Sequence, residues 1–175
     1  VGMHYLHGTP LNKVSEQLDL EPGTLTGIFH RLAHLFKTVP EQLIPLYRQA
    51  PVKHADETGW RNNGHHGYVW LFATPRLSLF QFRGTRSGSI PQAVFGKEPL
   101  PGVLVVDRYA GYNRLPVTLQ YCYAHILRDL QELEKEFPEV AEVKTFVSTV
   151  APLLALAMNL RSQPLSDAKF YRQAK

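Results

Sequence analysis

Two aspartates stand where the sequence pattern predicts that strands end. Asp56 closes a short segment at 52–56, and Asp107 closes an apolar run at 103–106. If these strands are neighbours in a sheet, both carboxylates lie at one edge. Mg²⁺ and Mn²⁺ prefer oxygen ligands, and two carboxylates with substrate phosphate oxygens can hold them. Two such ions, about 3.5–4 Å apart, promote in-line displacement at phosphorus. The alternative is that each aspartate caps a following turn or helix.

Other side chains could support phosphodiester chemistry. Trp60 could stack on a flipped base, or it could belong to the core. Arg61, Arg83, Arg86 and Arg108 could contact phosphates; Arg108 is the best candidate because it adjoins Asp107, and the others are interpreted as surface charge. Glu57 should face away from Asp56, which favours a supporting or surface role.

One helical segment and one Cys-x-x-His pair complete the candidate residues. Arg31 lies with His30, His34 and Lys37 on the polar side of a segment that could read a DNA groove, or could be an ordinary solvated helix face. A structural zinc site needs four ligands, and Cys122 and His125 supply two. The chain contains no second cysteine that could supply another.

The elements expected to position these groups change from helices to strands near residue 50. Residues 1–50 read as amphipathic helices, with a break at 20–24 and Thr24 as the expected cap of the second helix. An antiparallel meander follows, then a buried strand whose lack of polar alternation favours a parallel, central position. The order predicts a mixed α/β fold with strands at 52–56, 68–74, 77–83, 101–107 and 118–123, and helices at 89–95, 125–137 and 140–160.

The composition and charge of the chain exclude some classes of protein. The 175 residues are 44% hydrophobic and carry a net charge of +4, which excludes a disordered chain and permits a polyanionic partner. We expect no membrane span, because no uninterrupted apolar run approaches about 18–20 residues. The single cysteine fits a reducing cytoplasm. Neither a phosphate-binding Gly-x-x-x-x-Gly-Lys loop nor a Gly-x-Ser-x-Gly motif is present.

Four blocks of sequence resemble the insertion-sequence 66 family of bacterial DDE transposases. They are HADETGWR at 54–61, GYVW at 67–70, VVDRYAGY at 105–112 and QYCYAHILR at 120–128. The resemblance implies an RNase H-like core, with three antiparallel strands followed by two parallel ones. It also implies Mg²⁺- or Mn²⁺-dependent cleavage and joining of DNA at transposon inverted-repeat ends and target DNA, by a nucleoid-associated cytoplasmic protein that can form a homo-oligomer.

Carried over to this sequence, the resemblance makes Asp56 and Asp107 the first two acids of the catalytic triad and the metal ligands. His125 and Arg128 become supporting residues. The family's third acid, a glutamate on a late helix, has no match here, and the glutamates at 132–142 are interpreted as a solvated face. We therefore expect a partial transposase with weak or absent activity, whose third acid lies beyond Lys175.

The expected organisation is a helix-turn-helix-like DNA-binding segment at 1–50, the RNase H-like core at 51–137 and the start of a helical insertion at 138–175. Two other functions remain open: a DNA-binding remnant without catalysis, and an RNase H-like host nuclease that cuts without joining strands. All three share the fold, so the fold alone does not distinguish them.

Overall fold

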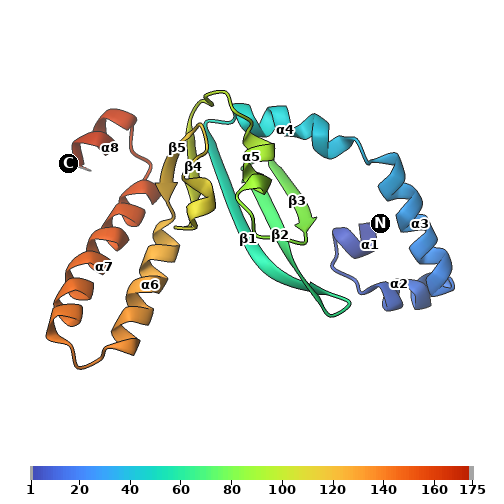
Figure 1. Ribbon diagram of the computed structural model, residues 1–175, viewed down its shortest axis with the longest axis horizontal. Helices are drawn as coiled ribbons and strands as arrows, with labels where there is room; N and C mark the ends of the chain where they lie inside the picture. The colour runs from blue at the N-terminus through green and yellow to red at the C-terminus, as the bar shows by residue number, and fades with distance from the viewer. Residues whose placement is uncertain (1, 174–175) are drawn as a thin grey trace. The chain divides into compact units, whose positions relative to one another are not determined.

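The computed structural model describes residues 2–173 and divides into two compact units, with the boundary between Arg48 and Gln49. Figure 1 labels the elements. The first unit is helical, as expected for this part of the chain. Its helices are α1 (Gly2–Tyr5), α2 (Leu11–Leu18), α3 (Pro22–Leu35) and α4 (Val39–Gln49), the last of which ends at the boundary.

A three-residue turn joins α2 to α3. Asp19 adopts a left-handed conformation with φ 50°, which ends α2, and the Ser15 hydroxyl donates to the carbonyl of Leu20. Helix α3 begins at Pro22 rather than at a Thr24 cap, so that prediction is wrong. Proline suits the first helical turn because its missing N–H would be unpaired there anyway.

The second unit contains one five-stranded sheet of order β3-β2-β1-β4-β5. The β1–β2 and β2–β3 pairs are antiparallel, whereas β1–β4 and β4–β5 are parallel. This is the predicted mixed sheet and the strand arrangement of an RNase H-like core. Its strands are β1 (Val52–Asn62), β2 (His65–Thr74), β3 (Leu77–Arg83), β4 (Val103–Val106) and β5 (Thr118–Tyr121).

Strand β1 is twice as long as expected and continues past Asp56 to Asn62. Beyond its parallel pairing with β4, β1 continues as a hairpin with β2, and the two strands pair as far as Asn62 and His65. Pairing with β2 alone keeps the exposed residues 58–62 in a strand. Asp56 therefore lies within a strand, not at its end, although it lies where the parallel part of the sheet finishes.

One face of the sheet forms the core together with α5 (Ser89–Phe95) and η1 (Ala110–Tyr112). Lys53 and Ala55 alternate with exposed neighbours on β1 and are both buried. Lys53 donates to the carbonyls of Ala50 and Pro101 at 2.7 and 2.5 Å, which ties the start of β1 to the segment before β4. The larger buried side chains of this core are Trp70, Phe72, Phe95, Leu104, Val106 and Tyr112.

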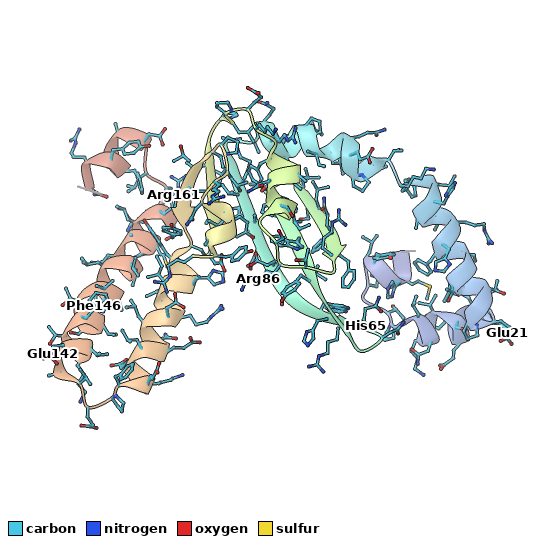
Figure 2. The ribbon with its side chains drawn as sticks, viewed as in Figure 1. Glu21, His65, Arg86, Glu142, Phe146 and Arg161 are labelled. Atoms are coloured by element: carbon cyan, nitrogen blue, oxygen red, sulfur yellow. The ribbon has the colours of Figure 1, made fainter. Side chains whose placement is uncertain are left out.

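Two helices after the sheet lie side by side as a hairpin, α6 (Tyr123–Glu136) and α7 (Ala141–Ser162), followed by α8 (Asp167–Gln173) (Figure 1). Within residues 2–173, α7 alone is long and apolar enough to cross a membrane by length and composition, with a mean hydropathy of 1.5 over an 18-residue window. We expected no membrane span because the chain has no uninterrupted apolar run of that length. Polar residues are spread along α7, so it meets the criterion as an average without containing such a run. Phe146, labelled in Figure 2, is among its exposed apolar side chains.

Candidate functional site

Asp56 and Asp107 lie at the same level of two neighbouring parallel strands. The β1–β4 register ends with His54 opposite Val105, and each aspartate follows two residues later. Asp56 is exposed and Asp107 is half-buried. Oδ1 of Asp56 accepts from the N–H of Glu57 at 2.9 Å, and Oδ1 of Asp107 accepts from the N–H of Tyr109 at 2.8 Å. Each carboxylate therefore retains a second oxygen.

These two carboxylates supply the hard oxygen donors that suit Mg²⁺ or Mn²⁺. Both lie close enough to the hydroxyl of Tyr112 to affect it: burial and a hydrogen bond to Glu57 raise the pKa of Tyr112, and the charges of Asp107 and Asp56 add to that rise. Within residues 2–173, no group of three or more His, Cys, Asp or Glu side chains is arranged to hold a metal. The donor set fits a divalent ion through two acids and contains no third.

The side chain of Glu57 was expected to face away from Asp56, in either a supporting or a surface role. Its side chain faces the core side of β1 and is completely buried, so the surface interpretation is wrong. Tyr112 donates its hydroxyl to Oε2 of Glu57, and Arg86 donates to Oε1 at 2.7 Å. Burial raises the pKa of Glu57, and these two hydrogen bonds oppose that rise.

Arg86, labelled in Figure 2, was interpreted as surface charge, and the structure places it inside the candidate site. Its guanidinium binds Glu57, lies 3.7 Å from Oδ2 of Asp107 and covers the ring of Tyr109 at 4.4 Å. The hydrogen bond from Arg86 to Glu57 is the main reason why the pKa of Arg86 is raised. Tyr109 also donates its hydroxyl to the carbonyl of Arg86.

Two glycines allow this close packing. A Cβ on Gly111 would lie 2.2 Å from the ring of Tyr109, and a Cβ on Gly88 would lie 3.1 Å from Gly111. The segment VVDRYAGY thus carries one acid, two aromatic side chains and the glycine that makes room for them. The spacing of Tyr109, Gly111 and Tyr112 after Asp107 is the signal from which this network could have been found.

A cavity of about 340 Å³ opens beside Asp107. Nδ1 of His125, on α6, is buried there without a hydrogen-bond partner in the part of the chain that the structure describes. An unpaired buried nitrogen in a polar cavity is typical of a ligand or water site. The lining residues are Arg86, Asp107, Arg108, Tyr109, Ala110, His125 and Asp129.

The predicted DNA-contacting residues lie in different places. Arg108 lines the cavity and forms an ion pair with Asp129 of α6, a residue that sequence reasoning missed. Arg128 is exposed and does not line the cavity.

Trp60 and Arg61 lie four and five residues beyond Asp56 on β1, roughly 13–17 Å further along the strand. Trp60 is 57% exposed, which excludes the core alternative for it. Arg31 is exposed on α3 of the first unit, whereas both acids belong to the second unit.

The chain shares sequence and structural features with known proteins. No curated protein matches it. Among solved structures, it is similar to the HTLV-2 integrase catalytic core domain in complex with magnesium, with 7% identity, a TM-score of 0.33, and coverage of 57% of this chain and 81% of that one. It is also similar to a chain of the simian T-cell lymphotropic virus intasome in complex with PP2A regulatory subunit B56 gamma, with 10% identity, a TM-score of 0.33, and coverage of 57% and 49%. The Transposase IS66 family matches residues 2–175, and the chain therefore belongs to that family.

Proposed function

We propose that the second unit is the catalytic core of a DDE-type transposase, which cleaves DNA at transposon ends and joins the freed 3′-hydroxyl to target DNA. The observation that supports this most directly is the register of the sheet, which brings Asp56 and Asp107 to one level of neighbouring parallel strands. Membership of the transposase family points to the same chemistry.

In this proposal Asp56 and Asp107 hold Mg²⁺ or Mn²⁺ through carboxylate oxygens. A divalent ion bound there supplies activation of the attacking oxygen and stabilisation of the leaving oxygen during displacement at phosphorus. The backbone N–H groups of Glu57 and Tyr109 orient the two carboxylates by occupying one oxygen of each. Carboxylates fixed in this way lose less conformational freedom when they bind an ion.

The cavity beside Asp107 is proposed to receive a DNA phosphate. Arg108 supplies positive charge at its edge, and the unpartnered Nδ1 of His125 can donate a hydrogen bond to a phosphate oxygen in the appropriate tautomer. Arg128, one turn further along α6, is exposed and supports binding by its charge.

Trp60 and Arg61 are proposed to contact DNA further along the β1–β2 hairpin. The exposed indole of Trp60 can stack on a base, and the guanidinium of Arg61, on the other face of the strand, can neutralise a phosphate. Arg31 and the helices of residues 1–50 form a second proposed DNA-binding segment, with 51–137 as the core and 138–175 as the beginning of a helical insertion. Because its proposed partner is DNA, the chain is proposed to act at the nucleoid in the cytoplasm. Two transposon ends must be held together, which requires a second copy of the chain.

A DNA-binding protein without catalysis is the second candidate function. Residues 2–173 contain no cluster of three metal-binding side chains, so the two acids lack the third carboxylate that the family uses. DNA binding that persists in EDTA, without any strand cleavage in Mn²⁺, would support this candidate.

The test combines metal affinity with DNA chemistry. Isothermal titration of Mn²⁺ into the chain should show binding that weakens at least about tenfold in Asp56→Asn and in Asp107→Asn, since even indirect partners of a metal contribute 10–100-fold. Asp167→Asn, a carboxylate in α8, is the matched control. Joining of a 3′-hydroxyl oligonucleotide to plasmid DNA is measured in parallel, and cutting without joining would indicate a host nuclease. Equal Mn²⁺ affinity in all four proteins would overturn the proposal.

A further inference from the structure

The guanidinium of Arg86 lies between two carboxylates but not midway. Its Nε and Nη2 both lie 2.7 Å from Oε1 of Glu57, whereas Nη2 lies 3.7 Å from Oδ2 of Asp107. The shorter distances are those of a charge-assisted hydrogen bond, and 3.7 Å is beyond hydrogen-bond range. Arg86 is therefore bound to Glu57 and only close to Asp107.

Three further contacts hold this arrangement. The Tyr112 hydroxyl donates to Oε2 of Glu57, which fixes the carboxylate from its other side. The ring of Tyr109 lies against the guanidinium at 4.4 Å, and its hydroxyl donates to the backbone carbonyl of Arg86. Because Glu57 is completely buried and bonded on both oxygens, it has no freedom to follow Arg86 towards Asp107.

We propose that Glu57 holds Arg86 back from Asp107, so that Oδ2 of Asp107 stays available to a divalent cation. The inference rests on the proposed function of Asp107. Glu57 acts through Arg86 and is a positioning residue, not a metal ligand. A guanidinium and a metal ion compete for the same carboxylate oxygen, since each is attracted to its negative charge. Without the charge of Glu57, the carboxylate remaining in contact range of Arg86 is Asp107.

Two variants predict changes of opposite sign in Mn²⁺ affinity. Glu57→Gln keeps an acceptor for Tyr112 but removes the charge that binds Arg86, so Arg86 moves onto Asp107 and Mn²⁺ binds about tenfold more weakly. Arg86→Gln removes the competing cation, so Mn²⁺ binds at least as tightly as in the parent. Isothermal titration measures both. Glu16→Gln, which breaks the exposed pair with Lys13, is the matched control and should leave the affinity unchanged.

A measurement without metal separates this inference from the proposed function. In ¹⁵N–¹H spectra, Asp107→Asn should leave the chemical shift of the Arg86 Nε–H signal unchanged in the parent. In the Glu57→Gln background, Asp107→Asn should change that chemical shift. The same response in both backgrounds would overturn the inference, as would unchanged Mn²⁺ affinity in Glu57→Gln or weaker affinity in Arg86→Gln. A parent that binds no Mn²⁺ would overturn the two-aspartate site, and the Nε signal would still decide whether Glu57 restrains Arg86.

Discussion

Replacing Tyr112 by phenylalanine removes one hydroxyl from a completely buried position. That hydroxyl donates to Oε2 of Glu57, whose side chain is also completely buried. Burial and this hydrogen bond raise the pKa of Tyr112 above its ordinary value of 10, so the hydroxyl is protonated and able to donate at neutral pH. The variant leaves one oxygen of a buried carboxylate without its donor.

A hydrogen bond to a charged group contributes about 1.5–3 kcal/mol to stability, and Glu57 keeps its bond to Arg86, so we expect Tyr112→Phe to lower the free energy of unfolding by about 2 kcal/mol. For a chain of this length that corresponds to a decrease in Tm of about 4–8 °C. Urea unfolding followed by tryptophan fluorescence suits this measurement, because the buried Trp70 ring lies 6.3 Å from the ring of Tyr112.

Tyr121→Phe is the matched control, because it removes the same atom from a side chain that is 43% exposed. Its effect should stay within about 0.5 kcal/mol, as for most surface substitutions. A Tyr112→Phe variant as stable as this control would refute the reasoning, since Glu57 would then have no need of the hydroxyl as a donor.

Three further predictions concern the start of β1 and β4 and the edge of the cavity. Gly102→Ala should lower the free energy of unfolding by at least about 2 kcal/mol in urea, because Gly102 has φ 75° and a Cβ there would lie 2.2 Å from the carbonyl oxygen of Pro51. Burial lowers the pKa of Lys53 below its ordinary 10.5. Between that lowered pKa and 10.5, the unfolded chain binds more protons than the folded chain, so the free energy of unfolding should rise with pH in this range. Unfolding curves at several pH values should show this rise in the parent and not in Lys53→Met. Asp129→Asn should change stability by less than about 1 kcal/mol, because its pair with Arg108 is exposed; a larger loss of thermal stability would show that the pair stabilises the fold.

The places of the strands along the chain were predictable because each strand has a local pattern. The apolar run before Asp107 indicates a strand buried on both faces, and alternation in 77–83 indicates a half-exposed one. The length of β1 was not predictable in this way. Residues 58–62 are exposed, so it is their pairing with β2, and not burial, that keeps them in a strand.

The common level of Asp56 and Asp107 was expected on the condition that their strands are neighbours, which the pairing of β1 with β4 meets, whereas the network behind them was not expected. Glu57 contacts Arg86 across 29 residues and Tyr112 across 55, and no local periodicity reports contacts of that separation. Arg86 lies in a segment rich in glycine and serine, which on pattern alone is typical of a solvated loop. Gly111 marks the place where this loop meets the segment that follows Asp107.

Crystals of the chain soaked in Mn²⁺ would test the central claim most directly. We expect an anomalous peak about 2.1–2.3 Å from a carboxylate oxygen of Asp56 and from one of Asp107, a distance typical of hard divalent cations. A peak bound to other residues, or no peak between these two aspartates at saturating Mn²⁺, would contradict it.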